Sequence, residues 1–279
     1  MGRFIAVLLF VALLFPAVFV GRVWSHAGVR RQVSNGALSL TVPTIEAERA
    51  MKVQAQRARL WRLAGLALAV ILSVAALVMF AESAVFLWPG LLVGGLVAGV
   101  LFGELTRVGP PWETRAPARR PQSEFVDRAL PTIGRLAALG LLAVGGLAMD
   151  RTWAHEYWIA AGIGVVSWLI VEATLERLAR RVTPSGAEDI PVDDALRINS
   201  AHVAVGAGSV LNLLILAGLL LVSGVRAGDS ASGSELAPVA LIAGAFGALV
   251  AALVISGFLI RWLAPVRWAE AAWGTAKRG

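Results

Sequence analysis

The segment HVAVGAGSVLNLLILAGLLLVS, from His202 to Ser223, decides the fold, because its 22 residues include no Asp, Glu, Lys or Arg. The hydrocarbon core of a bilayer is about 30 Å thick, and a helix rises 1.5 Å per residue. About 20 apolar residues are therefore enough to cross it. This segment predicts a membrane-spanning helix.

The whole chain has the composition of an integral membrane protein. Of its 279 residues, 58% are hydrophobic and 15% are charged, with a mean hydropathy of +0.75. A soluble domain carries about a quarter charged residues. We therefore expect an all-α polytopic bundle forming one domain over residues 1–279. Seven candidate transmembrane helices cover approximately 4–20, 61–81, 84–104, 133–149, 157–175, 202–223 and 237–260.

Arginine and lysine predict the orientation of these helices. Alternate connecting segments carry eight, six, four and four of the 25 basic residues, and the remaining segments carry three. Positive residues gather in cytoplasmic loops. The N-terminus is therefore expected outside and the C-terminus in the cytoplasm of a bacterium, in its plasma membrane. Ser25-His26-Ala27 resembles a signal-peptidase site, but cleavage would export the eight-charge loop, so we expect the first helix to be retained.

The candidate helices form three pairs joined by cytoplasmic loops, at about 4–81, 84–149 and 157–223, with 237–260 closing the set. Val126–Leu130 (VDRAL) returns as Val192–Leu196 (VDDAL), 66 positions later, each time before an apolar segment. We interpret the pairs as parallel internal repeats. We expect each copy to form a short cytoplasmic or interfacial helix with its carboxylate in the first turn, where the helix dipole favours it.

Four carboxylates hold equivalent places in the second and third pairs. Glu104 and Glu172 each end one helix, and Asp127 and Asp193 each precede the next. One interpretation makes them structural charges at the membrane interface. The other makes Asp127 and Asp193 a pseudo-symmetric pair that binds a cation or the arginines of a partner. Arg177, Arg180 and Arg181 are close enough in sequence to neutralise the acids around Asp193.

Gly103-Glu104-Leu105-Thr106-Arg107, followed by Arg115-Ala116, Asp127 and Pro131, resembles a family of uncharacterised multipass membrane proteins of actinobacteria. The resemblance covers about residues 100–190, and GPPWETRAPARRP departs from the family pattern. It implies a multipass fold and brings no activity with it.

Small and polar residues mark two further features. Gly95, Gly99 and Gly103 form a stripe at four-residue spacing, which lets helix backbones approach closely. Packing within the bundle and homo-oligomerisation both use such a stripe. Asn212, with Ser167 and Ser73 at similar depth, supplies polar groups near the membrane midplane, either for interhelical hydrogen bonds or for a solute site.

Several classes of function have no support in the sequence. There is no cysteine, and none of the histidines (His26, His155 and His202) has a second ligand at helical metal-site spacing. No nucleotide-binding or hydrolase motif is present, so we expect no catalytic residue, metal or cofactor. The net charge of +7 is attributed to cytoplasmic loops facing anionic lipid, not to nucleic acid.

The resulting hypothesis is a non-enzymatic membrane protein that scaffolds or docks a membrane or cytoplasmic protein through basic cytoplasmic loops. The alternative is a small permease or transporter subunit with a polar site near Asn212. The segment 44–62, acidic first and basic last, predicts a helix lying at the inner leaflet before the second span.

Overall fold

The computed structural model describes residues 45–80, 84–106, 121–147, 154–182, 190–228 and 236–263. Over these residues the chain is helical, with no strand, as the sequence predicts. The α-helices are α2 (Ile45–Phe80), α3 (Ala84–Leu105), α4 (Ala129–Leu147), α5 (Ala154–Arg180), α6 (Ile190–Gly228) and α7 (Leu236–Leu263), and a short 3₁₀ helix, η1 (Gln122–Glu124), precedes α4.

Five of these helices are long and apolar enough to cross a membrane. Their apolar stretches are Gln56–Ala75, Ala129–Leu147, Tyr157–Arg180, Leu196–Ala227 and Leu236–Leu259, and α3 contributes the shorter stretch Leu91–Leu105. Each predicted span from 61–81 onward overlaps one helix. The predicted first span, 4–20, lies outside the described residues.

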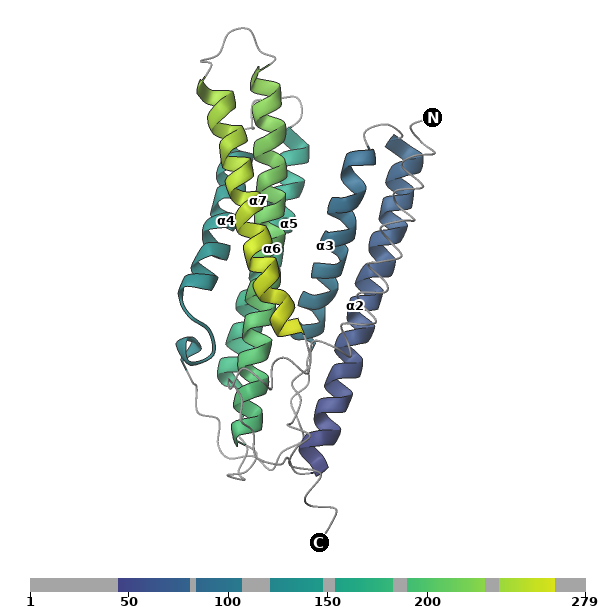
Figure 1. The fold of residues 1–279 in the computed structure, drawn as a ribbon, viewed down its shortest axis with the longest axis vertical. Helices are drawn as coiled ribbons and strands as arrows, with labels where there is room; N and C mark the ends of the chain where they lie inside the picture. Colours follow the sequence, from purple (N-terminus) through teal and green to yellow (C-terminus); the bar gives the residue numbers. More distant parts are fainter. Residues whose placement is uncertain are drawn as a thin grey trace.

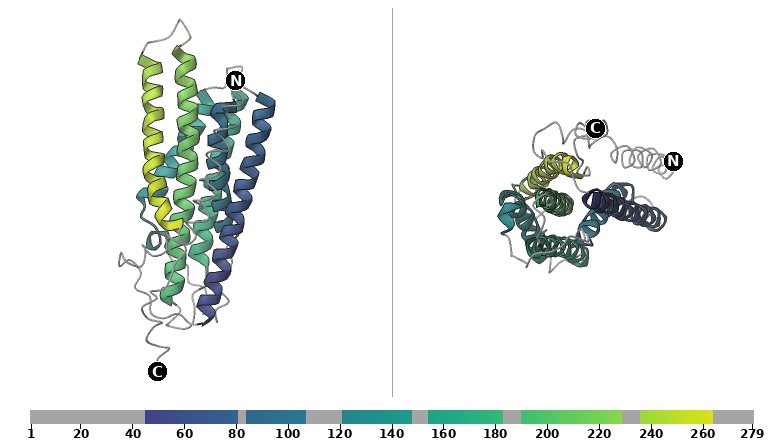
Figure 2. Two further views of the ribbon diagram at one scale, coloured as in Figure 1. Left: turned by 45° about the vertical axis from the view of Figure 1, so that its right-hand side comes forward. Right: turned by 90° about the horizontal axis from the view of Figure 1, so that it is seen from below.

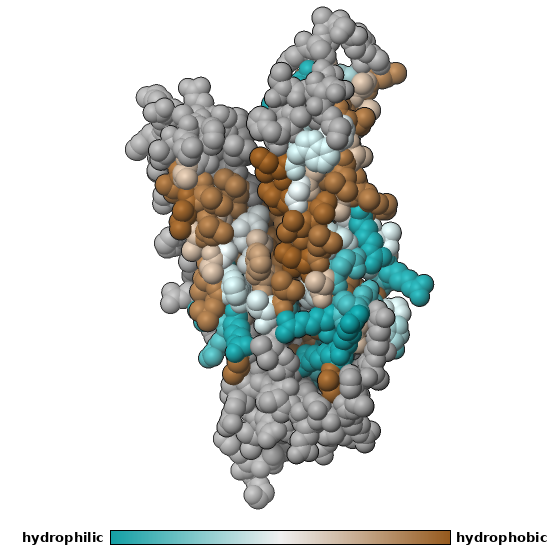
Figure 3. Space-filling view, turned by 180° about the vertical axis from the view of Figure 1, so that it is seen from behind, coloured by the Kyte–Doolittle hydropathy of each residue, from teal (hydrophilic) through white to brown (hydrophobic). Residues whose placement is uncertain are grey.

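Consecutive helices run antiparallel, so their ends alternate between two ends of an elongated bundle (Figures 1 and 2). The beginnings of α2, α4 and α6 and the ends of α3 and α5 lie at the same end, which we call the charged end. From behind, hydrophilic side chains gather toward this end, below a broad hydrophobic surface (Figure 3). The helices thus place at one end the residues that flank the arginine-rich segments.

Helix α6 is the centre of the bundle and packs on α3, α4, α5 and α7. Every residue from Val203 to Leu213 is buried. A helix surrounded on all sides must be apolar or small all round, and this stretch is rich in Ala, Gly and Val. A Cβ added at Gly208 would overlap the Val171 side chain of α5, and one at Gly206 would lie 3.1 Å from Leu259 Cδ1 of α7.

Two expectations about short helices are wrong. The helix predicted over 44–62 is not separate from the second span, because α2 runs without interruption from Ile45 through that span, over 36 residues (Figure 1). Val192–Leu196 likewise belongs to the first turns of the 39-residue α6 and not to a short helix, although Asp193 does lie in a first helical turn as predicted. Val126 and Asp127 precede α4. The physical reason is that no proline interrupts α2, and the proline in α6, Pro191, stands in its first turn, where it is tolerated.

Helices α2 and α3 meet along a seam of glycines. A Cβ added at Gly99 would lie 2.5 Å from the carbonyl oxygen of Trp61 and 3.1 Å from the Cα of Gly65, and one at Gly95 would overlap Ala69. Gly103 is less constrained, with Trp61 Cβ 3.4 Å from the added atom. Gly95 and Gly99 therefore have their close partner on α2 of the same chain, whereas a role in homo-oligomers stays a prediction.

Gly99→Ala is expected to lower the free energy of unfolding by about 1–3 kcal/mol, because the new methyl group meets backbone atoms that cannot rotate away. The measurement is reversible unfolding in mixed detergent micelles. Gly162→Ala is the matched control, since no heavy atom lies within 4 Å of a Cβ added there. Equal stability of both variants would contradict the close approach of α2 and α3.

Candidate functional site at the charged end

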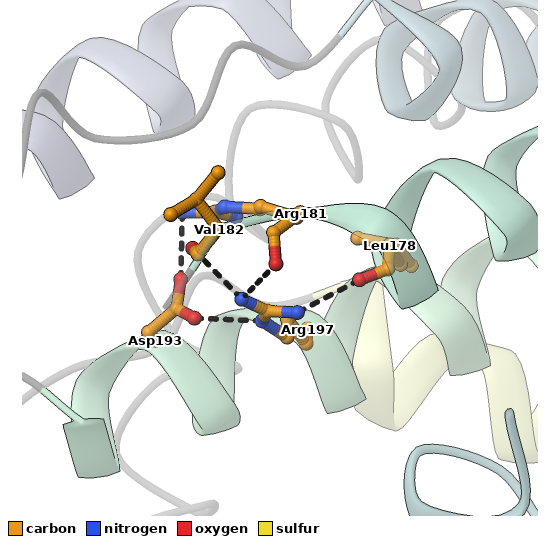
Figure 4. A network of polar contacts seen from close by, with 5 residues as sticks. All are labelled: Leu178, Arg181, Val182, Asp193 and Arg197. Carbon is orange, nitrogen blue, oxygen red and sulfur yellow. Dashed lines mark hydrogen bonds and ion pairs between the residues drawn. The ribbon is translucent and has the colours of Figure 1, made fainter. Parts of the chain in front are cut away.

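The charged end is built around Arg197, whose side chain is fully buried in the second turn of α6. Its Nε donates to Asp193 Oδ2 at 2.6 Å, one helical turn earlier (Figure 4). Asp193 is also fully buried, and its other oxygen forms an ion pair with Arg181 Nη2 at 2.7 Å. Two arginines therefore neutralise one carboxylate where water is excluded.

The same guanidinium closes the end of α5. Nη1 of Arg197 donates to the carbonyl of Leu178 at 2.8 Å, and Nη2 donates to the carbonyls of Arg181 at 2.9 Å and Val182 at 3.0 Å. The last carbonyls of a helix have no partner within the helix and carry the negative end of its dipole. Arg197 supplies both the donors and the positive charge, and so fastens the end of α5 to the start of α6.

Asp127, the counterpart of Asp193 in the first copy of the motif, has a different environment. It is exposed, and its Oδ1 accepts a hydrogen bond from the backbone N–H of Ala129 at 3.0 Å, at the start of α4. Among the described residues, Asp127 and Asp193 share no bonded partner. The structure does not bring the two carboxylates into one site.

Glu104, at the end of α3, is buried and accepts a hydrogen bond from the hydroxyl of Ser200 on α6. Arg177 of α5 donates to the neighbouring carbonyl of Leu105. The last turn of α3 is thus held by side chains from two other helices, and the Glu104 carboxylate faces the interior of the bundle.

Glu172 of α5 lies at the seam with α4. Its Oε1 accepts from Arg135 Nε and from Trp168 Nε1, both at 2.8 Å. The Glu172 side chain is 32% exposed and that of Arg135 is 49% exposed. An ion pair at this exposure is partly screened where solvent reaches it, but it fixes the direction of the Arg135 guanidinium.

Two shallow depressions adjoin each other beside η1 and the start of α4. The first, about 460 Å³, is lined by Ser123, Glu124, Phe125, Val126, Asp127, Arg128, Ile198 and His202. The second, about 490 Å³, is lined by Pro121, Gln122, Ser123, Val126, Arg128, Pro131, Thr132 and Arg135. Of the four predicted carboxylates, Asp127 is the one that lines either of these two depressions.

The polar residues predicted for the membrane midplane lie in two separate parts of the bundle. Ser167 of α5 donates to Asn212 Oδ1 of α6 at 2.8 Å, and both are buried. Ser73 is buried on α2, away from this pair. Within the described part of the chain, Asn212 Nδ2, Ser209 Oγ and Ser73 Oγ have no hydrogen-bond partner.

Sequence reasoning missed the role of Arg197, which was counted only as a positive charge. Its spacing from Asp193, four residues along a helix, places the two side chains on one face and indicates an ion pair. Nothing in the sequence indicated that Phe125 would be buried, with the guanidinium carbon of Arg197 5.9 Å from the centre of its ring.

Over the described residues, no group of three His, Cys, Asp or Glu side chains is arranged to hold a metal ion. No protein-family model matches the chain, and no curated protein or solved structure matches it either.

The two copies of the motif provide a matched pair of substitutions. Asp193→Asn is expected to lower the free energy of unfolding by about 3–5 kcal/mol, because it leaves two arginine side chains facing a neutral amide inside the protein. Asp127→Asn is expected to change it little, since Asn caps a helix about as well as Asp. Unfolding in detergent micelles measures both, and equal losses would show that the buried network does not stabilise the fold.

Proposed function

We propose that the chain is a non-enzymatic integral membrane protein that docks a protein partner through the first depression, beside η1 and α4. The single observation that carries this proposal is the contrast between Asp127 and Asp193. Both carboxylate oxygens of Asp193 are paired with arginines in a buried network. Asp127, in contrast, is exposed and lines a depression, and one of its oxygens accepts the hydrogen bond that caps α4.

The partner surface we propose is basic. Among the charged residues that line the first depression, the carboxylates of Glu124 and Asp127 outnumber the guanidinium of Arg128, and the exposed carboxylate of Asp127 attracts arginine or lysine side chains. Buried Phe125 and Val126 anchor the segment that presents these acids, so the surface is held in place before a partner arrives.

The membrane setting is part of the same proposal. We infer seven spans, with the N-terminus outside and the C-terminus in the cytoplasm of a bacterial cell, supported by the distribution of arginine and lysine between alternate segments. The charged end would then face the cytoplasm. The parallel repeat and the resemblance to an actinobacterial multipass family, which includes Glu104 and Asp127, belong to this proposal as well.

Crosslinking from the charged end tests docking. A photo-reactive residue replacing exposed Ser123 is expected to give a discrete protein adduct in cells, and the same residue replacing exposed Val225, at the opposite end of α6, is not. Asp127→Lys is expected to abolish the adduct because it places a positive charge against a basic partner.

The matched control is Glu176→Lys, which reverses a charge on α5 outside both depressions. It is expected to leave the adduct intact. An adduct that survives Asp127→Lys, or one that forms equally from position 225, would overturn the docking proposal.

A second candidate, a permease subunit, is favoured by the buried amide of Asn212. In the amide orientation that accepts from Ser167, its Nδ2 has no acceptor among the described residues, and an unsatisfied buried donor is uncommon in a stable fold. A solute or a water molecule that supplied an acceptor would satisfy it.

Asn212→Leu distinguishes the two candidates. If the amide serves only packing, the variant is expected to lose about 0.6–1.7 kcal/mol of stability, the range for interhelical hydrogen bonds in membranes, and to leave solute uptake unchanged. Solute uptake by cells that carry Asn212→Leu is compared with solute uptake by cells that contain the same amount of the Ser167→Ala variant. Ser167→Ala removes the hydroxyl that donates to the Asn212 amide. Loss of uptake in Asn212→Leu at unchanged protein level would favour the permease.

A further inference from the structure

Two arginines line the second depression. Arg128 immediately precedes α4, Thr132 lies in the first turn of α4 and Arg135 in its second, and all three line this depression. Gln122 and Ser123 of η1 also line it. The result is a concave surface of about 490 Å³ whose lining includes side chains that can donate hydrogen bonds.

The donors in this depression are those that a phosphate group requires. Arg135 donates from Nε to Glu172, so its two terminal nitrogens, Nη1 and Nη2, remain as donors on the outer edge of the guanidinium group. Arg128 has no carboxylate within ion-pair distance among the described residues. The hydroxyl proton of Thr132 is donated to the Arg128 carbonyl, so Thr132 shapes the wall and does not donate to a ligand.

The acidic residues near the second depression do not line it. Glu172 holds the Nε of Arg135, and Glu124 and Asp127 line the first depression and not the second. Arginine binds phosphate through planar, charge-assisted pairs of hydrogen bonds. Two such side chains around one concavity therefore favour an anion.

The face of α4 that bears Arg135 becomes apolar further along the helix. Leu139 and Leu142 follow Arg135 at spacings of four and then three residues, and they are 60% and 40% exposed. Because helical side chains lean toward the N-terminus, Arg135 is directed back toward the charged end, and an arginine stem lies well along an apolar surface. One stripe thus runs from cationic to hydrocarbon along the axis of α4.

We propose that this stripe binds an anionic phospholipid, with its phosphate between Arg128 and Arg135 and an acyl chain along Leu139 and Leu142. A phosphorylated peptide or a free phosphate would use the arginines but not the exposed leucines above them. Basic pockets at the cytoplasmic ends of membrane helices are suited to lipid headgroups of this kind.

Native mass spectrometry of the full-length chain in detergent tests the proposal, with phosphatidylglycerol or phosphatidylcholine of the same acyl length as probes. The chain is expected to retain phosphatidylglycerol in preference to phosphatidylcholine. Arg128→Gln is expected to weaken the binding of phosphatidylglycerol about fivefold, which is the effect of one basic residue at an anionic lipid surface. Arg128→Lys, which keeps the charge, is expected to retain most of the affinity.

Arg180→Gln is the matched control, because Arg180 is an exposed arginine of α5 that pairs with Glu176 and lines neither depression. It is expected to bind phosphatidylglycerol like the parent chain. Equal binding of the two lipids, an equal loss in Arg180→Gln, or full competition by millimolar inorganic phosphate would overturn the lipid assignment. The assay contains no protein partner, so its outcome is independent of docking at Asp127.

Discussion

The buried guanidinium of Arg197 is the interaction on which the charged end depends. An arginine enters a protein interior at acceptable cost only when its charge is balanced and its donors are satisfied. Here Asp193 balances the charge, and three carbonyls at the end of α5 take the remaining donors. The end of α5 and the beginning of α6 consequently behave as one structural unit, although the residues between them lie outside the described ranges.

This unit also determines where the surface beside α4 lies. Phe125 places its ring near Arg197, and Phe125 and Val126, which connect η1 to α4, are buried in the main hydrophobic core. Their neighbours Ser123, Asp127 and Arg128 are exposed on the same short segment. The buried ring of Phe125 packs near the guanidinium of Arg197 and thereby holds in place the segment that lines both depressions. The proposed partner surface and the proposed lipid surface therefore depend on the same buried contact.

The sequence allowed the described helices to be predicted, because long apolar stretches report directly on membrane-spanning segments. The orientation inferred from the clustered arginines stays a prediction. It did not allow Asp127 and Asp193 to be distinguished by their shared motif. The difference lies four residues beyond each carboxylate, where the first copy has Pro131 and the second has Arg197. The other partners of Asp193 and Arg197 come from the last turn of α5 and the two residues that follow it, and such tertiary contacts leave no periodic signal. Gly65, which faces Gly99, was missed for the same reason.

The arrangement around α6 bears on the choice between docking and transport. A transporter must exchange two arrangements of its helices around a site at the midplane. Helix α6 packs on four other helices, and side chains of α5 and α7 fill the spaces over Gly208 and Gly206. Sliding α6 would drive its neighbours into backbone at these positions, which close-packed interiors resist. The Ser167–Asn212 hydrogen bond lies within this packed region, whereas Asp127 and Arg128 lie where a ligand can reach them without any helix moving. Binding at the charged end is therefore the activity that requires the least change in this fold.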